Sequence, residues 1–183
     1  MAMLSRANWT ILAVAVLVAG VGGWLQHQSR LAKVPVGVHV ANVGDLRPDL
    51  ALLDLDGKEH RLSEYRSRRV LLNFWASWCG PCLDEMPALA RAQAKFGEKD
   101  VIVVGVAMED PGHVRPFLTS HPVSYPILIG RLDSPSTSLR LGDTSEVLPY
   151  SVLLDAEGRV LATRRGALDA ATLEQWLAPP GSR

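Results

Sequence analysis

The sequence predicts an α/β sandwich, in which helices cover a mixed β-sheet. Two apolar, β-branched runs carry this prediction, at residues 70–76 (VLLNFWA) and 101–107 (VIVVGVA), because nearly continuous runs of this kind are typical of strands buried on both faces of a sheet. Each run is followed by a segment with helical signals, which gives the alternation of an α/β domain. The 183 residues are enough for one such domain and an additional N-terminal segment.

The N-terminal segment is expected to cross a membrane. Residues 9–25 (WTILAVAVLVAGVGGWL) are uncharged and almost wholly apolar. Their number lies at the short end of the roughly 17 to 25 residues of a membrane-spanning helix, and Trp9 and Trp24 stand where an aromatic belt would lie. A buried core helix is disfavoured, because no face carries a polar stripe. A cleaved signal peptide is the stronger alternative, since Arg6 precedes the run and small residues stand at Gly20 to Gly23, interrupted only by Val21.

Both interpretations of this segment export the rest of the chain. The run continues past the small residues to Leu25, which favours an uncleaved anchor. Basic residues stand on both sides of it, so charge asymmetry alone does not orient it. A linker (KVPVGVHV) ends at residue 40. We therefore expect residues 1–40 to be the anchor, or signal peptide, with its linker, and residues 41–183 to be the globular domain.

The elements of the domain follow in the order hairpin, strand, helix, strand, helix, hairpin, helix. The first hairpin turns at Asp56-Gly57, and the second at 155–158, where Gly158 provides a positive φ. Asp110-Pro111 is a start signal for the second helix. The expected ranges are a hairpin at 50–62, strands at 70–76, 101–107, 150–154 and 159–164, and helices at 79–96, 112–121 and 168–177.

The composition excludes several classes of function. With 19 Lys+Arg against 19 Asp+Glu, the formal net charge is zero, so no global field attracts nucleic acid. Two cysteines are too few for a disulfide-rich scaffold or an all-cysteine zinc site. We therefore expect no metal, no cofactor and no nucleic-acid partner, and a function carried by local groups.

One cysteine pair has the context of a redox site. The motif at 78–82 (WCGPC) directly follows a buried strand and opens a helix. Cys79 faces the unpaired N–H groups of the helix start, which favour a thiolate, so we predict that it is the nucleophile. Cys82 lies one turn deeper, where it can close a disulfide and resolve a mixed disulfide. Half a metal site and a structural disulfide are the disfavoured alternatives, because no nearby His or Cys completes a metal-ligand spacing.

At these residues the sequence resembles the thioredoxin superfamily, and specifically the membrane-anchored TlpA/ResA-like thiol-disulfide oxidoreductases of bacteria. The similarity covers about residues 45–177 and includes 73–77 (NFWAS), Pro87, Pro149 and the 50–62 hairpin. It implies a thioredoxin-like three-layer sandwich with an added N-terminal β-hairpin and a central insertion, which we expect within 110–130. One transmembrane helix precedes this fold in the family.

Peroxidase activity is not expected. Peroxiredoxins share the fold but carry Thr three residues before the peroxidatic Cys, and that position here is Ala76.

The resemblance implies an acid/base at Glu85, which takes the proton of Cys82 when this thiol attacks. Glu85 follows Cys82 by three residues and so shares its helix face. Cytosolic thioredoxins use a buried Asp on the preceding strand instead, and Asn73 holds that place here. The alternative is an ordinary solvated glutamate.

The resemblance also implies a cis peptide bond before Pro149. This would leave the backbone of Leu148 free to pair with an extended substrate strand. Leu148 and Tyr150 depart from the residues usual in the family beside this proline, so substrate preference stays open. The expected substrate-binding residues are Trp78, Gly80, Pro81, Leu148 and Pro149.

Together these features predict a monomeric, membrane-tethered thiol-disulfide oxidoreductase, single-pass in the inner membrane with its catalytic domain in the periplasm. An oxidising compartment already holds strong oxidants, so a reductase of protein disulfides is the favoured direction. The resemblance implies a membrane electron donor of the DsbD/CcdA kind and, as client, the Cys-x-x-Cys-His motif of apocytochrome c. A copper-binding assembly factor for cytochrome oxidase and a disulfide-forming oxidase are the open alternatives.

Overall fold

The computed structural model describes most of the chain, as two compact units, Met1–Lys33 and Val34–Arg183. The described residues are 6–29, 34–35, 37–97 and 101–179, with side chains of the first range described from 9 to 24. The linker expected to end at residue 40 falls partly outside these residues. The functional division at that residue stays a prediction.

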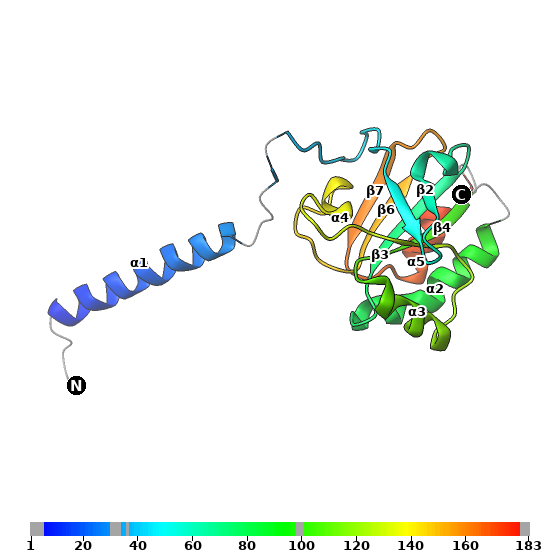
Figure 1. Cartoon of the computed structure of the whole chain (residues 1–183). Coiled ribbons are helices and arrows are strands. Elements are labelled where there is room, and N and C mark those ends of the chain that lie inside the picture. Colours follow the sequence, from blue (N-terminus) through cyan, green and yellow to red (C-terminus); the bar gives the residue numbers. More distant parts are fainter. Residues whose placement is uncertain (1–5, 30–33, 36, 98–100, 180–183) are drawn as a thin grey trace. The chain divides into compact units, whose positions relative to one another are not determined.

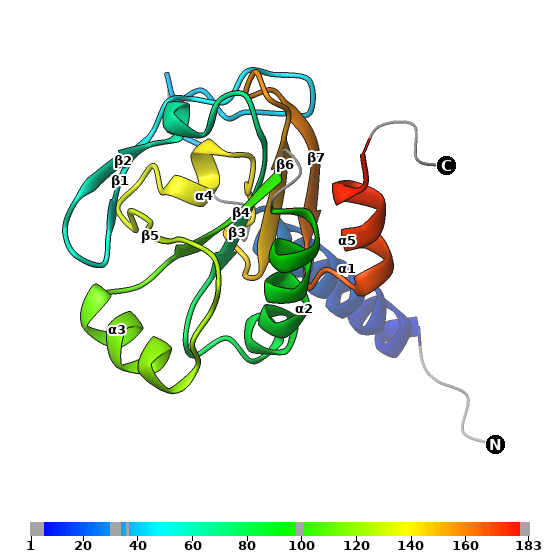
Figure 2. The same cartoon turned by 90° about the vertical axis from the view of Figure 1, so that its right-hand side faces the viewer.

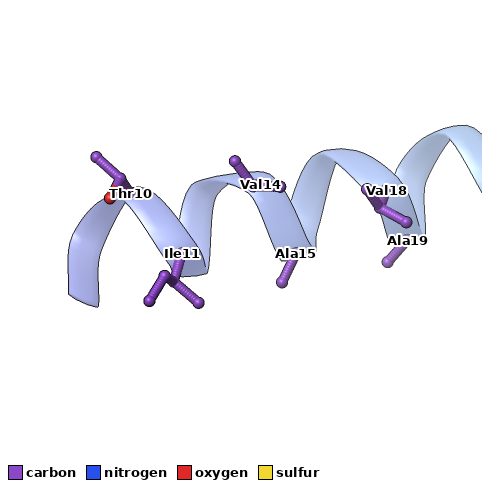
Figure 3. A pocket seen from close by; sticks show the side chains of 6 residues that line it. All are labelled: Thr10, Ile11, Val14, Ala15, Val18 and Ala19. Atoms are coloured by element: carbon purple, nitrogen blue, oxygen red, sulfur yellow. The ribbon is translucent and has the colours of Figure 1, made fainter. Parts of the chain in front are cut away.

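The first unit contains a single helix, α1 (Arg6–Ser29). Six of its side chains lie at spacings of three and four along the helix and are shown in Figure 3: Thr10, Ile11, Val14, Ala15, Val18 and Ala19. Within the described part of the chain, no helix combines the length and the apolar character needed to cross a membrane. The transmembrane helix expected at residues 9–25 is therefore not found there.

The second unit is built on one mixed sheet of seven strands (Figure 1). The strand order is β2-β1-β5-β4-β3-β6-β7, and all of these strands are labelled in Figure 2. β3 and β4 are parallel to each other, whereas β6 is antiparallel to β3. The two predicted buried runs are β3 and β4, which lie inside the sheet and so are apolar on both faces. The strands are β1 (Ala51–Asp54), β2 (Glu59–Arg61), β3 (Arg69–Trp75), β4 (Val101–Ala107), β5 (Ile127–Ile129), β6 (Tyr150–Leu154) and β7 (Val160–Arg165).

Helices of very different lengths flank this sheet. α2 and α5 pack side by side on one face (Figure 2). α3 begins where its start signal predicts, because the Asp110 carboxylate accepts the N–H of Gly112 at 2.7 Å and so caps the helix. The elements are η1 (Leu62–Tyr65), α2 (Gly80–Phe96), α3 (Pro111–Ser120), α4 (Thr137–Arg140) and α5 (Ala170–Leu177).

A hydrophobic core lies on each face of the sheet, because alternate residues of a strand point to opposite sides. Leu71 and Trp75 of β3 pack with α2 and α5 on one face. Leu72 and Phe74 pack on the other face, against Leu62 of η1 and neighbouring segments. The expected layered thioredoxin-like sandwich is confirmed, although short helical turns and irregular segments, not long helices, form its second outer layer.

The middle of the chain differs from the expectation. Between β4 and β6 it forms α3, β5 and α4, of which only α3 was predicted. β5 lies between β1 and β4 and thereby joins the predicted 50–62 hairpin to the rest of the sheet. β5 and α4 have three and four residues, too few to give a periodic signal in a sequence.

Candidate active site

The two cysteines form a disulfide at the start of α2, with their Cα atoms 5.3 Å apart. Cys79 is the N-cap residue, and its carbonyl oxygen accepts the N–H groups of Cys82 and Leu83 at 3.0 and 3.2 Å. Cys79 is 6% exposed, whereas Cys82 is fully buried. Cys79 therefore keeps a small exposed fraction, whereas Cys82 has none.

The start of α2 provides a positive electrostatic environment for Cys79. The first turn of the helix carries no acidic side chain that would offset the macrodipole, and a proline occupies its beginning. Trp78 is 71% exposed, and Gly80 and Pro81 are exposed as well. These three predicted substrate-binding residues are thus exposed and stand directly beside Cys79 in the chain, while their contact with a substrate stays a prediction.

Glu85 lies in the protein interior, on the same helix as Cys82. It is 3% exposed, and its carboxylate accepts the side-chain amide N–H of Asn73 and the backbone N–H of Leu168, each at 2.7 Å. Burial raises the pKa of Glu85, and these two hydrogen bonds oppose part of that increase. The solvated alternative is thus wrong for this residue, while its role in proton transfer stays a prediction.

Asn73 links Glu85 to the neighbouring strand. Its side-chain amide also donates to the hydroxyl of Ser151 at 3.1 Å, and the two residues are directly paired between β3 and β6. Ser151 was not among the predicted site residues, although the pairing of β3 with β6 places it beside Asn73. No local signal pointed to the backbone amide of Leu168, which is 83 residues away from Glu85.

The segment before β6 has the backbone that the resemblance implied. The Leu148–Pro149 peptide bond is cis. Leu148 is half-buried and packs against the core cluster that contains Cys79 and Cys82. Pro149 is buried, and its carbonyl oxygen accepts the N–H of Gly166 at 2.8 Å. Contact of Leu148 and Pro149 with a substrate stays a prediction.

The described residues offer little to a metal ion. Among them, no group of three or more His, Cys, Asp or Glu side chains is placed to hold one. The donor set at the redox site is two sulfurs, with Glu85 engaged by Asn73 and Leu168. The arrangement is suited to exchange of a disulfide, since Cys79 lies at the helix start beside exposed residues and Cys82 is fully buried.

Comparisons with known proteins agree with this geometry. The model of the redoxin family matches residues 42–177. The thiol-disulfide oxidoreductase ResA of Geobacillus thermodenitrificans is 34% identical over 136 residues, which cover 74% of this chain and 76% of that protein. The thioredoxin-like protein YneN of Bacillus subtilis is 30% identical over 174 residues, covering 93% and 96% of the two chains.

A solved structure extends the similarity to three dimensions. The crystal structure described as the thiol:disulfide interchange protein DsbE of Chlorobium tepidum superimposes with a TM-score of 0.66 at 32% identity, and covers 74% of this chain and 95% of that one. The CxxC disulfide at the start of α2, the thioredoxin-like sheet and these relatives lead to one conclusion. The chain belongs to the redoxin family of the thioredoxin superfamily and is a thiol-disulfide oxidoreductase of the TlpA/ResA-like kind.

Proposed function

We propose that this protein reduces disulfides of other proteins, with Cys79 as the attacking thiol and Cys82 as the resolving one. The observation that supports this most strongly is the difference between the two cysteines. Cys79 is the N-cap of α2, is 6% exposed and follows the exposed Trp78, whereas Cys82 is fully buried. An incoming disulfide meets Cys79 first, where the helix start favours the thiolate.

The proposed cycle starts from the reduced dithiol. The Cys79 thiolate attacks one sulfur of the substrate disulfide and forms a mixed disulfide, while the other substrate sulfur leaves as a thiolate and takes up a proton. Cys82 then gives its proton to Glu85, and its thiolate attacks the Cys79 sulfur. The Cys79–Cys82 disulfide forms, and the second substrate sulfur leaves. Two electrons have passed to the substrate, and a donor dithiol then restores the pair.

Glu85 is suited to receive this proton because of its surroundings. Burial raises its pKa, so the carboxyl group binds a proton more readily than a solvated glutamate does. The hydrogen bonds that its carboxylate accepts from Asn73 and Leu168 hold both oxygens in place. Proton transfer to and from a buried thiol requires a carboxyl group that is held in a fixed position and has a raised proton affinity, and Glu85 meets both conditions.

We also propose the cellular setting. The domain faces the periplasm, attached to the inner membrane through residues 9–25, receives electrons from a membrane donor of the DsbD/CcdA type and acts as a monomer on apocytochrome c cysteines. The uncharged sequence of residues 9–25 and the similarity to proteins named ResA and DsbE support this proposal. Copper handling and disulfide formation remain its alternatives. Stoichiometric copper binding by the reduced protein would favour the first, and a strongly oxidising redox potential the second.

Insulin reduction tests the assignment of the two cysteines. We expect the full-length protein to reduce insulin disulfides with dithiothreitol as donor, and Cys79→Ser to abolish this activity. Cys82→Ser should instead accumulate long-lived mixed disulfides, visible on non-reducing gels, because attack persists while resolution is lost. A Cys79→Ser protein that keeps the parent rate would show that Cys79 is not the nucleophile.

A further inference from the structure

One buried carboxylate near the disulfide has no part in the proposed cycle. Glu109 is 6% exposed and follows β4 by two residues. Its two oxygens accept both donors of Ser77: the backbone N–H at 2.5 Å and the hydroxyl at 2.9 Å. A carboxylate that is buried to this extent must be compensated by hydrogen bonds, which the two donors of Ser77 provide. The presence of this buried group next to the cysteine motif therefore needs a functional explanation.

Ser77 belongs to the turn that leads into α2. The N–H of Cys79 donates to the carbonyl oxygen of Ala76 at 3.1 Å and closes this turn over Ala76–Cys79. The N–H of Ser77, the second residue of the turn, is not used by that hydrogen bond and must find a partner outside it. Glu109 is this partner, and it binds the Ser77 side chain as well.

The sheet holds Glu109 in place. The N–H of Met108 donates to the carbonyl oxygen of Trp75, the last residue of β3, at 2.8 Å, which continues the pairing of β3 and β4 one residue beyond the end of β4. On the other side, Asp110 caps α3. Glu109 therefore extends from a backbone fixed at both neighbours, and its carboxylate ties the turn before Cys79 to the end of β4.

We propose that Glu109 is a positioning residue for Cys79. By fixing the Ala76–Cys79 turn through Ser77, it keeps Cys79 at the N-cap of α2, where the helix N–H groups favour its thiolate. This inference rests on the proposed role of Cys79 in exchange. Titratable groups that face the same core cluster as Cys79 include Cys82 and Tyr125, which belong to it, and Glu85, which accepts the N–H of its member Leu168.

The test measures the Cys79 thiol directly. In full-length protein carrying Cys82→Ser, the rate of iodoacetamide alkylation is followed from pH 5 to 9. We expect Glu109→Ala to raise the apparent thiol pKa by about one unit toward the unperturbed value of about 8.5, and so to slow alkylation at pH 7 about tenfold. Glu109→Gln should show no such rise, since its amide can accept the Ser77 N–H and donate to the Ser77 hydroxyl, and loss of the carboxylate charge favours the thiolate.

Glu157→Ala, an exposed glutamate in the turn between β6 and β7, is the matched control and should leave the alkylation profile unchanged. A folded Glu109→Ala protein with the parent profile would overturn the inference, because a purely structural role lowers stability without moving the thiol pKa. If Glu109→Ala does not fold, Glu109→Asp decides: its shorter side chain keeps the charge but not both contacts, so a parent-like profile again overturns the inference.

This readout is separable from the proposed exchange mechanism. Alkylation reports on the Cys79 thiol whether or not that thiol attacks substrates, whereas the insulin assay with Cys79→Ser tests the attack itself. If the insulin assay shows that Cys79 is not the nucleophile, Glu109→Ala can still change the rate of Cys79 alkylation. If Cys79 is the nucleophile but Glu109→Ala leaves alkylation unchanged, only the inference about Glu109 fails.

Discussion

At the residue scale, the buried and hydrogen-bonded Glu85 carboxylate gives the most specific prediction about proton transfer in the exchange reaction. Glu85→Gln preserves the side-chain volume but removes the proton-accepting group. The glutamine amide has one oxygen in place of two, so either the Asn73 or the Leu168 N–H loses its acceptor and faces the NH2 group. We expect release of mixed disulfides to slow about 10²-fold, the lower end of the range for positioned acid/base groups. Stopped-flow reduction of a model disulfide across pH 5 to 9 measures this, and a parent-like rate throughout would contradict the proton transfer.

The same substitution has a defined effect on stability. Because burial raises the pKa of Glu85, the folded state binds its proton more tightly than the unfolded state does. The resulting stabilisation is complete below the unfolded pKa and is lost as the pH rises through the folded one. The parent should therefore lose stability relative to Glu85→Gln as the pH rises above about 4.3, the value for a solvated glutamate. Urea unfolding of both proteins at several pH values gives the difference.

The sequence showed some of these residues and not others, for physical reasons. Cys79, Cys82 and Glu85 were predictable because they lie on one helix, where spacing fixes the shared face. Ser77 and Glu109 were not, because their hydrogen bonds join residues 32 positions apart through the pairing of two strands. Long-range polar contacts depend on register, which single-sequence patterns do not give.

At the scale of elements, the same contrast holds. β3, β4, α2 and both hairpins were predicted, because each combines enough residues with a clear apolar pattern or a turn signal. β5 was missed, yet it connects the added hairpin to the sheet through pairing with β1 and β4. A three-residue strand owes its conformation to its neighbours and not to its own composition.

α3 offers a test of a predicted element boundary that bears on the redox site. Phe117 of this helix packs against Trp75, the last residue of β3, with the ring centroids 5.5 Å apart. Asp110→Ala removes the cap of α3 and should lower the free energy of unfolding by about 1 kcal/mol. Asp110→Asn is the matched control, because an asparagine side chain accepts the same N–H and should restore most of the loss. Equal stability of the Ala variant and the parent would show that the cap contributes nothing.

At the scale of the whole molecule, the redox site is contained in one of the two units. The disulfide, Glu85 with its partners, the Pro149 segment and both hydrophobic cores all belong to Val34–Arg183. α1 contributes none of the residues assigned to exchange. Activity and attachment are thus expected to be independent properties of this chain, carried by different segments.

Removal of residues 1–33 separates these two properties. The shortened protein keeps every hydrogen bond described around Glu85 and Glu109, so we expect it to fold and to reduce insulin within about twofold of the full-length rate. After expression of both forms, the full-length protein should sediment with membranes and be released only by detergent if residues 9–25 attach it as proposed, while the shortened form should stay in the supernatant. Full-length protein in the soluble fraction would refute attachment through residues 9–25 without affecting the redox assignment. A shortened protein that is folded but inactive would instead show that the N-terminal segment contributes to the site.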